Sequence, residues 1–459
     1  MRMKLFGIIG LAITTSCGMA NQVWEKPIAP GLVYRMEVQQ DPPRVIHSLK
    51  MITSNPVTSI MPELAGKTVF DAKGDGRTTV SKLVNDTNAL AAINADFFPF
   101  GANPSGDPLG LMVREGQFLS LPNPKRATFA WGPTSSVFGF SKFTGSVTPE
   151  SGPSFEINGF NEDCPENRIT LNSPEAGISR SKQPCVTVIL KVDGTRLTPS
   201  TQIGASVVAV TNDGANMPLK AGQYTLVAHG NKMNVLSGFK TGQRLVIKLS
   251  TTGFDWEKLE NAVSGGPMLM RNGDVNIDAE NEGFAKDFIE GRHPRTAIGR
   301  TTEGDLLFVA IDGRQKMSVG ATLEEAAQIM KNLGCRDALN LDGGGSTCMN
   351  VFGINVNRPS DKSGERAVAN GIVFYGPRLL VPEQKLKIVV PSTIAANGFG
   401  QAKVVDKNGK EIPNIEVFWS LQGTAWIDQG GQVAGLEAGT VTVEAYVRGM
   451  TLSTKVIIK

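Results

Sequence analysis

The chain lacks a long apolar segment beyond its N-terminus and has almost no net charge. Its 459 residues include 46 basic and 43 acidic side chains, and 41% of the residues are hydrophobic. This is the composition of a globular protein with room for two or three domains. The charge balance gives no argument for a nucleic acid or a membrane surface as partner. The short apolar runs predict no membrane span.

Several widespread catalytic motifs are also missing. The sequence contains no GxSxG, no HExxH and no calcium loop of the Asp-x-Asp-x-Asp-Gly type, so the common serine-hydrolase, zincin and EF-hand interpretations have no support. A glycine run at 343–345 is followed by Ser346 with no lysine before it, and it is therefore not a nucleotide P-loop. The cysteines show no CxxC spacing and predict no zinc site.

The N-terminus has the pattern of a secretory signal peptide. Arg2 and Lys4 precede an apolar run at 5–13 and small residues that end at Ala20, which predicts cleavage after Ala20. We therefore expect a secreted, periplasmic or cell-envelope protein, with 44 basic and 43 acidic groups once the two N-terminal cations are removed. Acylation of Cys17 as a lipoprotein is the alternative, and Thr14 disfavours it because an apolar residue usually occupies that place.

Four cysteines remain after such cleavage. An even count in an exported protein favours disulfides, and the order along the chain predicts the local pairs Cys164–Cys185 and Cys335–Cys348. Buried free thiols are the alternative for the second pair.

A change in the pattern of apolar runs and turns along the chain predicts two domains after the signal peptide. Residues 21–377 are expected to form a domain of the α+β or α/β class, with a mixed sheet covered by helices and an insertion at about 153–200. Residues 378–459 contain short alternating strands separated by turns, which predicts a small all-β sandwich similar to bacterial Ig-like domains, with Trp419 in its core.

The most regular stretch of the first domain lies at 306–341. An apolar run ends at Asp312, a helix follows in which Thr322 and Glu325 form a capping box, and a second apolar run ends at Asp342. A strand–helix–strand crossover makes the two strands parallel. We therefore expect Asp312 and Asp342 at one edge of the sheet, where ligands of α/β sheets bind.

Two further features follow the same logic. An apolar stretch at 89–93 leads to Asn94 and Asp96, although an isolated Asp after a strand commonly only caps a turn. Directly after Asp342, three glycines could bring backbone N–H groups against a ligand.

These motifs occur in an order that resembles the phosphodiester glycosidase family. The residues that carry the resemblance are 94–98, 265–267, 293–299, 312–314, 340–347 and Arg366. The resemblance covers roughly residues 30–377. It implies hydrolysis of a sugar, N-acetylglucosamine being one candidate, from a sugar-1-phosphodiester in a glycan or cell-surface polymer.

The resemblance and the residue types together suggest a substrate site. The planar fork of arginine matches phosphate oxygens, so we expect Arg295, Arg314 and Arg366 to hold the phosphate. The other expected substrate-binding residues are Asn94, Asp96, Gly265, Gly266, Thr296, Asn340, Gly343, Gly344, Gly345 and Ser346.

The expected catalytic groups are Asp342, Asp312 and His293. Either aspartate could act as nucleophile or as base for water, and His293 could donate a proton or only bond to the diester. Strong acid catalysis is less important than in ordinary glycoside hydrolysis, because the leaving phosphate monoester is a weak base. A bound Ca²⁺ or Mg²⁺ is an alternative way to balance converging carboxylates.

Two competing functions remain open. The same residues would suit a phosphodiesterase that breaks a P–O bond. They would also suit a surface protein that binds a glycan without turnover, carried by the C-terminal domain. The number of charged residues expected at strand ends favours an enzyme.

Overall fold

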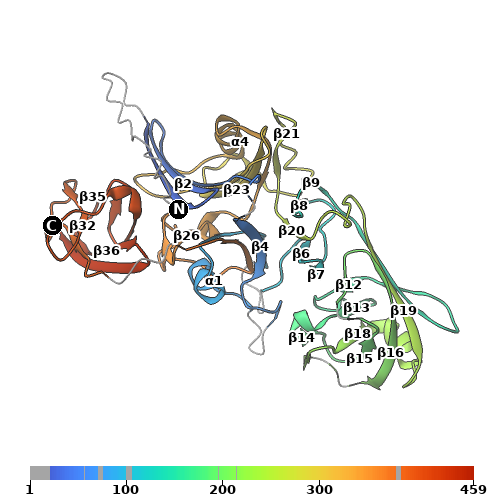
Figure 1. Cartoon of the computed structure of the whole chain (residues 1–459). Coiled ribbons are helices and arrows are strands. Elements are labelled where there is room, and N and C mark those ends of the chain that lie inside the picture. The colour runs from blue at the N-terminus through green and yellow to red at the C-terminus, as the bar shows by residue number, and fades with distance from the viewer. Residues whose placement is uncertain are drawn as a thin grey trace, which may run out of the picture.

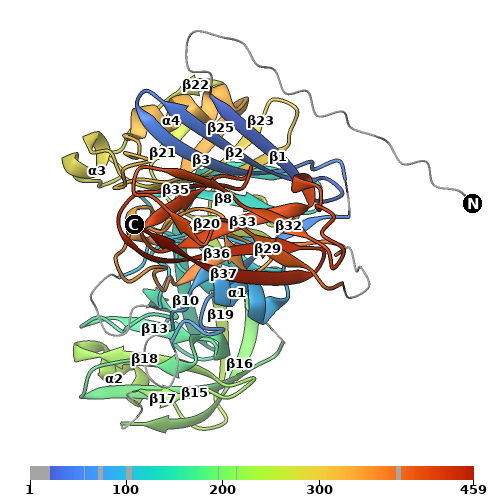
Figure 2. The same cartoon turned by 90° about the vertical axis from the view of Figure 1, so that its left-hand side faces the viewer.

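The computed structural model describes residues 21–55, 57–70, 76–99, 106–194, 196–212, 214, 216–378 and 384–459. The expected signal peptide lies outside the described residues. Figure 1 shows a central body with the C-terminal domain on one side and a separate sheet on the other, and Figure 2 shows the C-terminal domain facing the viewer. Among the described residues, no helix combines the length and the apolar character required to cross a membrane.

The predicted fold class is wrong, because the protein is mostly β, with 47% of residues in strands and 10% in helices. The central body is built on an eight-stranded sheet in which every neighbouring pair runs antiparallel. In spatial order its strands are β1 (Gln22–Ala29), β2 (Leu32–Gln40), β3 (Pro43–Met51), β24 (Leu306–Ile311), β23 (Arg295–Thr301), β25 (Cys335–Asn340), β21 (Met268–Arg271) and β22 (Asp274–Val275).

The crossover at 306–341 exists, but a third strand lies inside it. Helix α4 (Leu323–Asn332) connects β24 to β25, which point the same way, and β23 lies antiparallel between them. All six residues of β24 are buried, because α4 packs on one face of the sheet and the main core on the other. A strand buried on both faces loses the alternation that marks an antiparallel sheet, which explains the error. The ends of β24 and β25 and the start of β23 still share one edge.

Two smaller antiparallel sheets cover the inner face of the large one. The first contains β27 (Ile354–Asn355), β26 (Met349–Val351), β5 (Ala91–Asn94), β28 (Asn370–Tyr375) and β4 (Ser59–Leu64). The second contains β7 (Gln117–Ser120), β6 (Met112–Arg114), β20 (Asn261–Ser264), β8 (Ala127–Trp131) and β9 (Ser136–Phe140).

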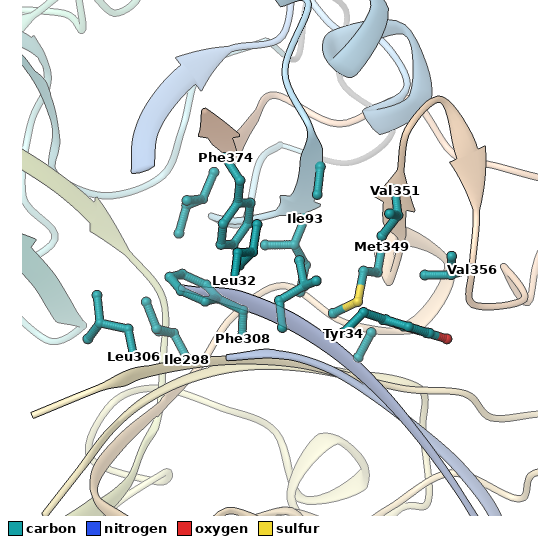
Figure 3. Packing of buried hydrophobic residues seen from close by; sticks show 14 of the residues in the cluster. Leu32, Tyr34, Ile93, Ile298, Leu306, Phe308, Met349, Val351, Val356 and Phe374 are labelled. Carbon is teal, nitrogen blue, oxygen red and sulfur yellow. The ribbon is translucent and has the colours of Figure 1, made fainter. Parts of the chain in front are cut away.

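The core lies between these sheets. Figure 3 shows Ile298 and Phe308 of the large sheet packed toward Ile93 and Phe374 of the first smaller sheet, and the rings of Phe308 and Phe374 meet edge to face with centroids 4.8 Å apart. Helix α1 (Val80–Thr87) covers the outer face of β5 and β28. Helices therefore cover the body from outside, while the core itself is made by strands.

A separate eight-stranded sheet leaves the body between β10 (Phe143–Pro149) and β19 (Arg244–Thr251). This range is wider than the insertion expected at about 153–200. Between these strands in the chain lie β11 (Phe155–Ile157), β12 (Gly159–Phe160), β13 (Ile169–Asn172), β15 (Cys185–Val192), β16 (Thr201–Thr211), β18 (Tyr224–His229) and the short helix α2 (Met233–Ser237). Its core cluster also includes Val113, Phe118 and Ala262 of the second smaller sheet, so the separate sheet packs against the body.

The C-terminal domain consists of mostly antiparallel strands around a core that contains Trp419. Its main strands are β33 (Val417–Gln422), β34 (Ala425–Ile427), β35 (Gln432–Gly435), β36 (Gly439–Val447) and β37 (Met450–Ile458). The domain is docked on the body: the ring of Tyr446 stacks on Phe352 at 4.2 Å, and buried Lys26 donates hydrogen bonds to the carbonyls of Asn414 and Val417.

The predicted disulfides are not formed, and all four cysteines of the described chain are free and buried. Cys164 and Cys185 share a small cluster, yet the thiol of Cys164 donates to the carbonyl of Val227 at 3.3 Å. Cys335 packs in the cluster under α4 and Cys348 in the cluster under α1. The number and order of cysteines alone carried no information on these positions.

Candidate functional site

A pair of buried carboxyl groups, Asp96 and Asp342, marks the candidate active site. Asp96 follows β5 and Asp342 follows β25, and the amide of Asp342 donates to the carbonyl of Ala95 at 2.9 Å. One oxygen of Asp96 accepts from the amide of Phe97 at 2.7 Å. The other, Oδ2, is buried without a hydrogen-bond partner in the described chain, although the Gly110 amide lies on that side. A buried acceptor left open in this way suits a ligand donor.

Burial shifts both carboxyl groups toward neutral pH. It raises the pKa of Asp96 to about 7, against the lowering effects of the Phe97 amide and the charge of Arg126, and the charge of Asp342 raises this pKa further. Burial also raises the pKa of Asp342 to about 6, while the Ser346 hydroxyl, the charge of Arg366 and the Gly343 amide lower it. Two interacting acids with raised pKa values are typical of a catalytic pair.

Asn94 and Thr296 position this pair. The Asn94 amide donates to the carbonyl of Asp342 at 2.7 Å, and its oxygen accepts from the Thr296 hydroxyl at 2.9 Å and from the Cys348 amide at 3.1 Å. Both side chains are fully buried. The sequence motifs around Asp96 and Asp342 are therefore joined by direct bonds, in which Asn94 and Thr296 act within the protein.

The glycine turn is partly committed to its own structure. The amide of Gly343 donates to Asp342 Oδ1 at 2.9 Å, and the amide of Gly344 donates to the carbonyl of Pro294 at 2.9 Å. Two of the three expected phosphate donors are thus used inside the protein. Gly344 has φ +61°, a conformation that favours glycine, and the side chain of Arg314 lies 3.4 Å from where its Cβ would be.

The second glycine pair, Gly265 and Gly266, lies against the same strand end. A Cβ on Gly265 would collide with the carbonyl of Asn340, and Asn340 donates to the carbonyl of Gly266 at 2.7 Å. Gly266 has φ +141° and faces Phe284 and Glu282. These glycines allow close approach of backbone to backbone, which is a structural role.

Arg126 is a site residue that the sequence analysis missed. Its guanidinium lies over the rings of Phe284, at 4.1 Å from the centroid, and Phe97, at 4.8 Å. Burial lowers the pKa of Arg126, and the charges of Asp96, Glu282 and Asp342 raise it. It is therefore the cation that faces all three carboxyl groups. Arg126 comes from a loop without a recognisable motif, and only the fold identifies it.

Glu282 is the third carboxyl group near this arginine, and it was also missed. It is 4% exposed, and its Oε1 accepts from the amide of Met268 at 2.9 Å. Burial raises its pKa. Its surroundings in the sequence, the acidic segment 278–282, resemble an ordinary solvated loop, so local sequence gave no signal.

The expected phosphate arginines differ in what they can offer. Arg295 is fully buried, donates to the carbonyls of Ala321, Phe288 and Gly291 at 2.6 to 3.0 Å, and has only one nitrogen, Nη1, without a partner in the described chain. Burial lowers its pKa to about 10. Its main contribution is to support α3 (Lys286–Glu290) at the rim of the site.

Arg314, His293 and Arg366 lie around the glycine turn. Arg314 is exposed, and its Nη2 lies 3.1 Å from Nδ1 of His293, whose Nε2 lies 3.1 Å from the carbonyl of Asp287. Arg366 forms a two-point ion pair with Asp361, at 2.8 and 3.0 Å, directly over Gly345. Its charge acts on Asp342.

Asp312 is turned away from the pair. Its carboxylate accepts from the amides of Arg358 at 3.0 Å and of the Asn357 side chain at 3.2 Å, and it faces His47 at 3.6 Å. These neighbours lie beside Trp419 and Trp426 of the C-terminal domain. Asp312 shares the sheet edge with Asp342, as expected, but its bonds indicate a structural role. Within the described residues, no group of three or more His, Cys, Asp or Glu side chains could hold a metal ion.

Part of the chain is also similar to a known protein family. Residues 189–375 match the phosphodiester glycosidase family. The match leaves out Asp96 and Arg126, which the fold brings to the residues inside it.

Individual relatives match shorter parts. The N-acetylglucosamine-1-phosphodiester alpha-N-acetylglucosaminidase of Mus musculus is 29% identical over 136 residues, 26% of each chain. The SPbeta prophage-derived uncharacterized protein YomE of Bacillus subtilis (strain 168) is 38% identical over 86 residues, 19% of this chain and 13% of YomE. The match therefore spans about a quarter of the first of these relatives and 13% of the second.

A solved structure extends the similarity to the fold. A hypothetical protein from Synechocystis has a TM-score of 0.64 at 25% identity, with 78% of this chain and 64% of that chain covered.

Proposed function

From the phosphodiester glycosidase domain at 189–375, we propose that this chain is a hydrolase that releases a sugar from a sugar-1-phosphodiester in a glycan or cell-surface polymer. The observation that carries the proposal is the buried pair Asp96 and Asp342 beside Arg126. A carboxylate and a protonated carboxyl group side by side serve the sugar, and a guanidinium serves the phosphate.

The charge of Asp342 raises the pKa of Asp96, so a proton shared by the pair resides preferentially on Asp96. Asp342, with the lower pKa, is the ionised group near pH 7 and attacks the anomeric carbon or removes a proton from the attacking water. Asp96, with a pKa of about 7, is about half protonated at the same pH, and in its protonated form it donates a hydrogen bond from its Oδ2 side to the substrate. Arg126, together with exposed Arg314, balances the charge of the phosphate.

In the net reaction one water molecule is added across the bond between the anomeric carbon and the phosphate oxygen. The carbon–oxygen bond breaks, its electron pair stays on the phosphate, and the products are the free sugar and a phosphate monoester. Because the monoester is a weak base, it can leave without a strong proton donor. We also propose an extracytoplasmic location, from the N-terminal segment 1–20, which mass spectrometry of the N-terminus of the exported protein would test.

The function is tested by releasing a sugar from a synthetic sugar-1-phosphodiester. Asp342→Asn should lower kcat by roughly 10²- to 10⁴-fold, the range for loss of an acid–base group. Asp255→Asn, an exposed aspartate in the separate sheet's connection, is the matched control. Unchanged turnover by a folded Asp342→Asn protein would remove this residue from the chemistry.

Hydrolysis in ¹⁸O-labelled water distinguishes the two bonds. We expect the label in the sugar, because attack occurs at carbon. Label in the phosphate would instead indicate a phosphodiesterase, and absence of turnover on any sugar-1-phosphodiester would favour a binding protein.

A further inference from the structure

A cavity of about 430 Å³ lies next to the loop that carries Arg126, and Pro124 and Lys125 of this loop line it. Residues that line it include Lys125, Arg271, Asn276 and Glu282. Lys125 directly precedes Arg126 in the chain, and Glu282 acts on Arg126 through its charge. The cavity therefore adjoins the proposed site. None of the residues assigned to the reaction lines it.

Glu282, which lines the cavity, carries a buried oxygen without a hydrogen-bond donor among the described residues. Glu282 is 4% exposed, and while Oε1 is bonded to the Met268 amide, Oε2 makes no hydrogen bond within the described chain. The Ala127 amide acts on the Glu282 charge but is not placed to bond to Oε2. Gly266 packs closely against this oxygen, because a Cβ there would lie 3.0 Å from Oε2 and 2.9 Å from the ring of Phe284. A buried oxygen of this kind is costly unless a ligand donates to it, as a hydroxyl group would.

Two cations stand at the mouth of the same cavity. Lys125 and Arg271 are exposed, and neither takes part in an ion pair among the described residues. The guanidinium of Arg271 lies over the ring of Phe140 at 5.1 Å, which orients it, and its charge acts on Glu282. The lining also includes exposed Asp278, whose carboxylate accepts a hydrogen bond from the side chain of Asn281. The acceptor Glu282 and the two cations fit a group that carries hydroxyls and a terminal anion.

We infer that this cavity binds the part of the substrate beyond the scissile phosphate, a sugar or polyol that carries a second phosphate. Glu282 accepts from its hydroxyl, and Lys125 and Arg271 hold the second phosphate. The inference rests on the proposed function and makes it more specific: the substrate is a repeating sugar-phosphate or polyol-phosphate chain, not an isolated diester.

The experiment compares two substrates with the same scissile bond. The short one is the methyl diester of a sugar-1-phosphate, and the long one replaces methyl by glycerol 3-phosphate. The wild type should have at least a ten-fold higher kcat/KM on the long substrate. Arg271→Ala should reduce the ratio of the two kcat/KM values about ten-fold, as expected for the loss of one charge-assisted contact. Lys240→Ala, an exposed lysine of the separate sheet, is the matched control.

A ratio in Arg271→Ala within two-fold of the wild type would overturn the inference, as would equal wild-type activity on both substrates. Failure to cleave the short substrate would instead count against the proposed function. In that case, calorimetric titration with glycerol 3-phosphate tests whether the cavity binds a phosphate group. The inference requires that the wild type binds it and that Arg271→Ala and Glu282→Gln bind it at least five-fold more weakly. Absence of binding would overturn it.

Discussion

The guanidinium of Arg366 lies directly over the α-carbon of Gly345, where its ion pair with Asp361 holds it. A methyl group at position 345 would collide with both side chains. We expect Gly345→Ala to lower the free energy of unfolding by roughly 1–3 kcal/mol, as for other insertions into close-packed sites. Displacement of Arg366 should also raise the pKa of Asp342, because this arginine lowers it. Urea unfolding and the pH dependence of kcat/KM measure both effects.

Gly139→Ala is the control for this substitution, since a Cβ there would meet the ring of Phe254 at an ordinary 3.5 Å. It should be close to wild type in both measurements. If Gly345→Ala had the stability and the pH profile of the wild type, the prediction would be wrong. The turn and the ion pair would then be able to move apart without a loss of unfolding free energy.

Asp96 should make the protein less stable as the pH rises. Its pKa is about 7 in the folded protein and 3.8 ordinarily, so between these values the folded state binds more protons than the unfolded state. Stability from this group is therefore fully present below about pH 4 and decreases as the pH rises to 7, by a few kcal/mol in order of magnitude. Asp96→Asn should remove this dependence.

Urea unfolding at pH 5 and pH 8 tests the sign. The wild type should lose unfolding free energy between pH 5 and pH 8. Asp96→Asn should lose less, because it has no carboxyl group at this position to ionise. Asp255→Asn controls for the loss of a carboxylate, since Asp255 is exposed and its hydrogen bond with Lys258 lowers its pKa. A parallel pH dependence in wild type and Asp96→Asn would contradict the raised pKa.

Asp312→Asn should separate a structural aspartate from a catalytic one. Oδ1 of Asp312 accepts from Arg358 and Asn357, and Oδ2 accepts from Arg358 and faces His47, so an asparagine would lose the negative charge and the acceptor at Oδ2. We expect a loss of roughly 1–3 kcal/mol in unfolding free energy, with kcat reduced far less than in Asp342→Asn. Activity at 20 °C and the midpoint of thermal unfolding are the two measurements. A large loss of kcat at unchanged stability would show that Asp312 takes part in the reaction.

The sequence indicated the carboxylates and turns because their signals are local. A buried strand that ends in Asp96 or Asp342 can be recognised within ten residues, and the capping box of Thr322 and Glu325 fixed the start of α4. The antiparallel sheet could not be recognised in this way. It depends on β23 lying between β24 and β25, and nothing within any one of these strands specifies its neighbours.

The missed site residues have the same explanation. Arg126 and Glu282 lie on loops, and they reach the site only through the pairing of β8 and β20 and the packing of Phe284 near Gly266. The pairing of β8 with β20 joins positions more than 100 residues apart. Composition and motif spacing contain no information on them.

The C-terminal domain should unfold together with the central body. Tyr446 is 8% exposed, stacks on Phe352 at 4.2 Å and belongs to the same core cluster as Ile93 and Phe374. Tyr446→Ala leaves a cavity at this junction. The free energy of unfolding should fall by about 2–4 kcal/mol, and by the smaller amount if neighbouring side chains fill the cavity. Because the core is shared, the loss should appear in the body as well.

Hydrogen exchange of peptides from β5 and β28 measures the stability of the body separately. In Tyr446→Ala these peptides should exchange faster by the factor that corresponds to the loss in unfolding free energy. Phe399→Ala, in the same domain but 69% exposed, should leave them unchanged. Faster exchange confined to β36 and β37 would mean that the domain is an independent module, and the docking of Lys26 and Tyr446 would then add little to the stability of the site.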